Sequence, residues 1–229
     1  STPLFGLTAT LVVYVLAQAF YARTGQAPWA NPVLWSVATL AAGLTATGTA
    51  YPTYFSGAQF IHFLLGPAVV ALAWPLWQRR IALRARWGRF LLASLIGGTA
   101  AAGSAAGLAW ALGLPVEIVL SLAPKSVTAP VAMGVAEKIG GIPALAAIFA
   151  VITGMVGALS GKYLFDALGI ETGATGWMAR GFALGTAAHG IGAARALQVN
   201  ADAGAWAALA LGLQVVLASL LIPLVARLF

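Results

Sequence analysis

The sequence predicts an all-α membrane protein that crosses the bilayer several times. Of its 229 residues, 61% are hydrophobic and only 7% are charged, whereas a soluble domain usually carries about 25% charged residues. Stretches long enough for a membrane-spanning helix, which needs about 20 mostly apolar residues, follow one another along the chain. A chain with this composition cannot cover a water-facing surface, and it is too apolar to be disordered.

Eight hydrophobic segments justify this fold class, and we expect two of them to be broken or re-entrant. The first has neither a basic stretch before it nor a small-residue cleavage site after it, so we expect a true span rather than a signal peptide. The short connections leave no room for a soluble domain and predict one membrane domain over residues 1–229. The segments are Leu4–Tyr21, Val33–Ala50, Gln59–Trp77, Phe90–Leu112, Val116–Val135, Pro143–Phe165, Gly181–Leu197 and Gly204–Leu228.

Arginines give the expected orientation of these segments. Five arginines lie between Arg79 and Arg89, in the third short loop, and basic loops face the cytoplasm. Arg23 follows the first segment and should face the same side, so the N-terminus is expected to be extracytoplasmic. The basic residues do not form a face with interleaved aromatic residues, which excludes nucleic acid as a partner.

A weak internal repeat relates three pairs of segments. Pro67 and Pro124 are 57 positions apart, as are Val33 and Phe90, the starts of the segments that precede them. Each unit therefore consists of a plain segment followed by one with a Gly/Ala-Pro centre. A fainter third copy begins at Phe182. Repeats with Gly- or Pro-interrupted apolar segments are typical of transporters, although an Ala- and Gly-rich chain also produces such echoes by chance.

The stretch from Ser121 to Met133 predicts the first break. Pro124 and Pro130 each lack an amide donor and disfavour helical geometry in the preceding residue. The polar residues between them are Lys125, Ser126 and Thr128. Ser126 or Thr128 is suited to cap a new helix whose first turn contains Pro130. The start of such a helix has free N–H groups and a partial positive charge, which together attract anions.

Lys125 strengthens the prediction of an anion site. A lysine at the centre of a membrane helix costs about 2.5–3.5 kcal/mol on insertion scales, and intramembrane ionisable residues usually serve a function. The alternative is a kinked helix in which Lys125 reaches the headgroups or pairs with Glu117 or Glu137. Both interpretations stay open from the sequence.

The stretch from Gly181 to Arg195 predicts the second irregular segment. Its glycines and alanine pairs permit close approach of another helix, and Gly190 and Gly192 favour an opening there. On a continuous helix Thr186 and His189 would share a face. His189 exchanges protons near neutral pH, and Arg195 offers a bidentate fork for a carboxylate. The alternative is a small-residue packing face in which His189 bonds to a neighbouring helix.

No motif supports an enzyme, and we expect no cofactor and no metal. The chain has no cysteine and only two histidines, so disulfides and thiolate ligands are excluded and a histidine-based metal set is not expected. It lacks a nucleophile elbow, a phosphate-binding P-loop and a plausible Ser/His/Asp set.

Four stretches together resemble the LrgB/CidB family over nearly the whole chain. Bacterial members of that family are described as holin- or antiholin-like regulators of murein hydrolases, encoded beside a smaller LrgA/CidA membrane partner, and some are linked to pyruvate uptake. A related plastid protein, the glycolate/glycerate translocator, joins both parts in one chain. The resemblance implies a bacterial inner membrane protein that transports small monocarboxylates. The four stretches are Tyr54–Pro67, Leu122–Pro130, Gly140–Pro143 and Gly185–Arg195.

The resemblance and the residues together predict a transporter for pyruvate, glycolate, glycerate or lactate. We expect Lys125 and Arg195 to recognise the carboxylate, and Ser126, Thr128 and Thr186 to donate hydrogen bonds. His189 is expected to bind a substrate hydroxyl or to take part in proton coupling. The alternative function is a holin- or antiholin-like membrane protein that regulates lysis. The candidate partners for either function are an LrgA/CidA-like membrane protein and further copies of this chain.

Overall fold

The computed structural model describes residues 4–71, 74, 77 and 80–227, and within these residues every regular element is a helix. The chain divides into two compact units, Ser1–Trp74 and Pro75–Phe229, and each unit is described by itself. The single domain expected over residues 1–229 therefore stays a prediction. Arg79, which belongs to the basic cluster, lies outside the described residues.

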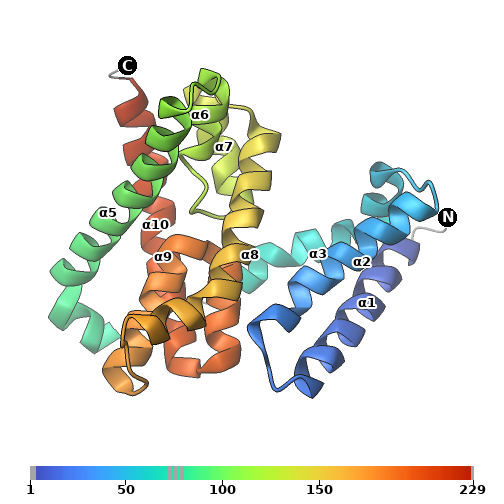
Figure 1. Ribbon diagram of the computed structural model, residues 1–229, viewed down its shortest axis with the longest axis horizontal. Helices are drawn as coiled ribbons and strands as arrows, with labels where there is room; N and C mark the ends of the chain where they lie inside the picture. The colour runs from blue at the N-terminus through green and yellow to red at the C-terminus, as the bar shows by residue number, and fades with distance from the viewer. Residues whose placement is uncertain (1–3, 72–73, 75–76, 78–79, 228–229) are drawn as a thin grey trace. The chain divides into compact units, whose positions relative to one another are not determined.

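The first unit is a small helical assembly in which α1 packs on α2 and α3 (Figure 1). Gly6 of α1 lies directly against the backbone of α3 at Tyr54 and leaves no room for a side chain. One turn further on, the Thr10 and Tyr54 hydroxyls are 2.7 Å apart. Asn31 starts α2 by accepting hydrogen bonds from two backbone N–H groups of its first turn. The elements are α1 (Leu4–Arg23), η1 (Pro28–Ala30), α2 (Pro32–Ala46) and α3 (Tyr51–Ala71).

The second unit is built around a close hairpin of α9 and α10. Asn200 ends α9 and caps α10 by accepting from the N–H groups of the next turn. Gly181 and Gly185 of α9 lie against the carbonyl oxygens of Ala203 and Ala207, so the two backbones touch. Helix α8 packs on α9, and α5 packs on α10. The elements are α5 (Arg80–Ala111), α6 (Val116–Leu122), α7 (Ala129–Ile139), α8 (Pro143–Ala167), α9 (Ala174–Val199) and α10 (Ala201–Ala226).

The expectation of eight hydrophobic spans is not confirmed. Four described helices are long and apolar enough to cross a membrane: α1, α8, α10 and the part of α5 from Arg84 to Ala111. Helix α2 has only 15 residues, and the segment Val116–Val135 is divided between α6 and α7. The segment Gln59–Trp77 extends past α3 into residues of which some are not described. Hydropathy therefore located the apolar stretches without determining where helices stop.

The two proline-containing segments of the expected repeat differ in structure. Pro67 lies inside a continuous α3, whereas Pro124 lies in a break between two helices. The faint third copy matches the second better, because the plain helix α8 is followed by an interrupted α9. A single proline removes one hydrogen bond and strains a helix, but membrane helices tolerate it where neighbouring groups satisfy the freed backbone. Pro124 and Pro130 instead flank Lys125 and two hydroxyl residues that favour non-helical backbone.

Candidate functional site

The first helix break lies where the prolines predict it. Helix α6 ends at Leu122 and α7 begins at Ala129, so the six residues 123–128 form a turn between them. The turn is closed by backbone hydrogen bonds from Lys125 N–H to the Leu122 oxygen, at 3.1 Å, and from Val127 N–H to the Pro124 oxygen, at 3.2 Å. A continuous helix through this stretch is excluded. Whether the segment is re-entrant stays a prediction.

Thr128 occupies the position that begins α7. Its backbone is extended, with φ −60° and ψ 147°, and Pro130 lies in the first turn as expected. The Thr128 side chain makes no capping hydrogen bond, so the expected side-chain cap is not formed. The first-turn N–H groups of a helix have no partner within the helix, and they lie at its positive end. Ala129 and Val131 supply two such groups here.

Lys125 and Ser126 lie within the turn that precedes this helix start. The Lys125 ammonium donates to the Ser126 hydroxyl at 3.4 Å; the lysine is half-buried and Ser126 is buried. Glu117 and Glu137 are exposed, and in the described part of the chain neither forms an ion pair with Lys125. The pairing considered as an alternative for Lys125 is therefore not observed.

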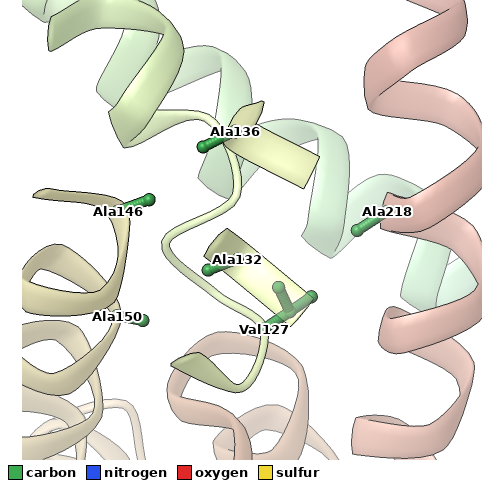
Figure 2. Packing of buried hydrophobic residues seen from close by; sticks show 6 residues of the cluster. All are labelled: Val127, Ala132, Ala136, Ala146, Ala150 and Ala218. Atoms are coloured by element: carbon green, nitrogen blue, oxygen red, sulfur yellow. The ribbon is translucent and has the colours of Figure 1, made fainter. Parts of the chain in front are cut away.

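A small apolar cluster holds the turn in place (Figure 2). Val127 is buried among alanines of α7, α8 and α10, and only 1% of its surface is exposed. The small side chains let three helices approach the turn closely. The alanines of this cluster are Ala132, Ala136, Ala146, Ala150 and Ala218.

The second break lies at Ala188 and His189 in α9, just before the Gly190–Gly192 stretch that predicted it. Ala188 has φ −120° and ψ 15°, and His189 has φ 42° and ψ −133°. A positive φ in a residue other than glycine costs on the order of 1–3 kcal/mol and persists only where the surroundings impose it. The imidazole is buried, and its Nε2 lies 2.7 Å from the Ala150 carbonyl oxygen of α8.

Glycines on α8 make room for the second break. A Cβ added at Gly154 would lie 2.9 Å from His189 Nε2, and one at Gly157 would lie 2.5 Å from the Ala188 Cβ. Such contacts are too short for a real side chain. The packing of α9 on α8 thus depends on glycine at both positions.

The two breaks meet inside the second unit. A Cβ at Gly190, directly after the break in α9, would lie 3.9 Å from the Thr128 Cγ2 at the start of α7. Lys125 lies three residues before Thr128, and His189 directly precedes Gly190. Ala150 joins the cluster around Val127 and also accepts the His189 hydrogen bond. The structure therefore brings Lys125, Ser126, Thr128 and His189 into one neighbourhood.

Thr186 packs on a different helix from His189. A Cβ added at Gly97 of α5 would lie 3.0 Å from the Thr186 Cγ2, so Thr186 packs on α5. His189 instead contacts α8. Thr186 and His189 would share a face only on a continuous helix, and the interruption of α9 at Ala188 and His189 removes that condition. Arg195 is buried in the second half of α9.

Sequence reasoning missed two polar contacts between distant residues. Arg180 Nη2 bonds to Asp166 Oδ1 at 2.7 Å, and the guanidinium also donates to the Ile170 carbonyl oxygen. Gln214 Nε2 of α10 donates to the Ser94 carbonyl oxygen of α5 at 2.6 Å. The partners in the second contact are 120 residues apart, so no local pattern signals it.

These features define a class: a helical membrane protein with several apolar spans and two interrupted helices whose breaks lie together. A family model described as the LrgB-like family matches residues 10–228. The chain belongs to this family.

Several curated relatives are bacterial proteins. The chain is 33% identical over 222 residues to the YxaC protein of Bacillus subtilis, covering 96% of this chain and 94% of that one. It is 27% identical over 228 residues to a protein of Staphylococcus epidermidis named holin-like protein CidB, and 28% identical over 221 residues to the Staphylococcus aureus protein of the same name. Both comparisons cover 96% of this chain and 94% of the relative. No solved structure matches the chain at a significant level.

Proposed function

We propose that this chain transports small monocarboxylates such as pyruvate, glycolate, glycerate or lactate across a bacterial membrane. The observation that supports this most is the close approach of Gly190, directly after His189, to Thr128, which lies three residues after Lys125. Half-helices that meet at a gap are the usual binding element of repeat-built transporters, and their N-terminal ends are directed at anionic substrate groups.

The proposed roles follow from charge and hydrogen-bonding capacity. The substrate carboxylate would accept from the first-turn N–H groups of α7, while the Lys125 ammonium supplies a full positive charge. The Ser126 and Thr128 hydroxyls would donate to the carboxylate or accept from a substrate hydroxyl. His189 would contact the substrate's second polar group. Arg195 would add positive charge in the second half of α9. Thr186 packs at Gly97 of α5, and we assign it no contact with the carboxylate.

The membrane setting belongs to the same proposal. The exposed arginines of α5, Arg84, Arg86 and Arg89, would face the cytoplasm of a bacterial inner membrane, which leaves the N-terminus extracytoplasmic. The holin-like names of the CidB relatives support an LrgA/CidA-like membrane partner. A homo-oligomer is compatible with the exposed apolar faces of the described helices.

The second candidate function is a holin-like one, and the names of the CidB relatives favour it. A holin-like assembly makes the membrane permeable or regulates lysis, and it needs no selective anion site. The two functions differ in selectivity: a carrier saturates with its substrate and retains neutral sugars, whereas a large pore releases both.

Reconstitution into sealed liposomes separates the two functions. Uptake of labelled pyruvate and glycolate is measured for the wild type, Lys125→Ala and Lys138→Ala, with leakage of a trapped neutral sugar recorded in parallel. Lys138 is an exposed basic residue in the last turn of α7 and serves as the charge-matched control. The carrier predicts saturable uptake in the wild type and Lys138→Ala, at least about tenfold slower uptake in Lys125→Ala, and no sugar leakage. Release of the trapped sugar by all three proteins to the same extent would favour the pore and contradict the carrier.

A further inference from the structure

Two buried hydroxyl groups in the second unit have no hydrogen-bond partner. Ser94 of α5 is completely buried, and Thr186 of α9 is 94% buried, with 6% of its surface exposed. Neither the Ser94 Oγ nor the Thr186 Oγ1 is hydrogen-bonded to any group in the described structure. Buried hydroxyls are almost always paired, and each unpaired one costs on the order of 1–3 kcal/mol. These two groups therefore require an explanation.

The missing bonds are not a general property of hydroxyl side chains in this protein. Thr99 of α5 bonds back to the carbonyl oxygen of Leu95 at 2.6 Å, and Ser160 of α8 bonds to that of Val156 at 2.7 Å. This return bond within a helix is the usual arrangement for serine and threonine. Ser94 and Thr186 forgo it although both lie in helices, which leaves their oxygen atoms available for a ligand.

Glycines bring the two hydroxyl residues and Gln214 to one face of α5. The Thr186 Cγ2 packs at Gly97, and the Gln214 Oε1 would lie 2.5 Å from a Cβ at Gly98. Ser94 lies three and four positions before these glycines, on the same helix face and about one turn away, or ~5 Å along the axis. The Gln214 Nε2 is already occupied by the Ser94 carbonyl oxygen. Side chains from α9 and α10 thus lie against α5 within about one turn of Ser94.

The break in α9 places the C-terminal end of its first half beside Thr186. Thr186 lies in the last turn before the break at Ala188 and His189. The last carbonyl groups of a helix segment lack N–H partners and form the negative end of its dipole. No ionised side chain is part of this cluster, so the site is neutral apart from the helix end. Neutral oxygens at the C-terminal end of a half-helix are the ligands that transporters use for Na⁺.

We propose that Ser94, Thr186 and Gln214 form a binding site for an alkali cation, with Na⁺ as the ion to test. The two hydroxyl oxygens and the Gln214 Oε1 coordinate the ion, and the carbonyl end of the first half of α9 stabilises its charge. The inference rests on these residues and not on the proposed carboxylate transport. Where the protein does carry carboxylates, the site would supply the coupling ion.

The test is thermal unfolding of the purified full-length protein without any carboxylate substrate, followed by intrinsic tryptophan fluorescence. NaCl is titrated against choline chloride at constant ionic strength. A ligand that binds only the folded state raises the unfolding temperature, so the wild type should show a saturable shift of about 2 °C or more at high Na⁺. Ser94→Ala and Thr186→Val should each lose most of this shift. Thr99→Val removes an exposed hydroxyl from the same helix and should keep the shift.

Two results would overturn the cation site. One is an unfolding temperature of the wild type that rises equally with choline and with Na⁺. The other is a full Na⁺ shift in both Ser94→Ala and Thr186→Val. If one variant does not fold, the other still decides, and equilibrium binding of radioactive ²²Na⁺ to the same proteins gives a second measurement. Lys125→Met should keep the Na⁺ shift while losing carboxylate binding. The Na⁺ shift and carboxylate binding are therefore measured independently, so one proposal can be contradicted while the other stands.

Discussion

The imidazole Nε2 of His189 lies 2.7 Å from the carbonyl oxygen of Ala150. Because a carbonyl oxygen only accepts, the ring donates through Nε2, and in the neutral ring Nδ1 is then the acceptor. This bond joins the break in α9 to α8, at a residue that also packs against Val127 in the turn between α6 and α7. The two interrupted segments are thus tied to the same point of α8.

Alanine at Gly154 should disturb this connection. A Cβ there would lie 2.8 Å from His189 Cε1 and 2.9 Å from Nε2, so the ring must move away from Ala150. Overpacking of this kind costs about 1–3 kcal/mol, which corresponds to a fall of a few degrees in the unfolding temperature. Gly134→Ala is the control, because that helical glycine has open space around it and alanine favours the helix. A Gly154→Ala protein as stable as Gly134→Ala would contradict the packing described here.

Alanine at Gly185 should separate α9 from α10. Its Cβ would collide with the carbonyl oxygen of Ala207, and backbone atoms cannot move aside as a side chain can. We expect Gly185→Ala to lower the unfolding temperature more than Gly154→Ala, whose neighbour is a side chain. Gly212→Ala on α10, where the space is open, should be close to neutral. Unfolding followed by tryptophan fluorescence tests this order, and an unchanged Gly185→Ala protein would refute it.

Replacement of Arg180 should destabilise the connection between α8 and α9 more than replacement of Asp166 does. Arg180→Met loses the hydrogen bonds to both Asp166 and the Ile170 carbonyl, whereas Asp166→Asn keeps the second contact. Asp166 is exposed, so the effect of Asp166→Asn should shrink in high salt, whereas most of the effect of Arg180→Met should persist. Unfolding temperatures at low and high salt test both statements. Equal losses in the two variants, with equal salt dependence, would argue against this role for the Ile170 contact.

The first break was predictable because its cause is local. Pro124 and Pro130 interrupt helical hydrogen bonding, and the residues between them are polar, so the sequence alone located the end of α6 and the start of α7. Pro67 was expected to mark a similar centre in its segment, but a single proline does not end the helix, and α3 continues through it.

The second break was predicted two residues too late because its position depends on tertiary packing. Gly190 and Gly192 made the region flexible, but the non-helical residues are Ala188 and His189. The glycines of α8 that receive these two side chains come some thirty residues earlier and have no sequence signal of their own. The same reason explains why Ser94 and Gln214 were not connected: their contact joins residues 120 positions apart.

The family resemblance and the all-helical class are confirmed, whereas the substrate and the site residues stay predictions. Composition and proline spacing indicate a basic interruption in a membrane helix, but they contain no information on which anion binds there. Thr186 shows the limit of helical periodicity: it should share a face with His189 only if the helix between them is continuous.

The central claim is that the turn containing Lys125 binds a small carboxylate, and equilibrium binding of pyruvate tests it most directly. Calorimetric titration of the purified wild type, Lys125→Met and Lys138→Met should give saturable binding in the first and third proteins. In Lys125→Met the affinity should fall by at least about tenfold, because a charged hydrogen bond is worth about 1.5–3 kcal/mol and 1.4 kcal/mol corresponds to tenfold. Equal pyruvate affinity in Lys125→Met and the wild type, or no binding to the wild type, would contradict the claim.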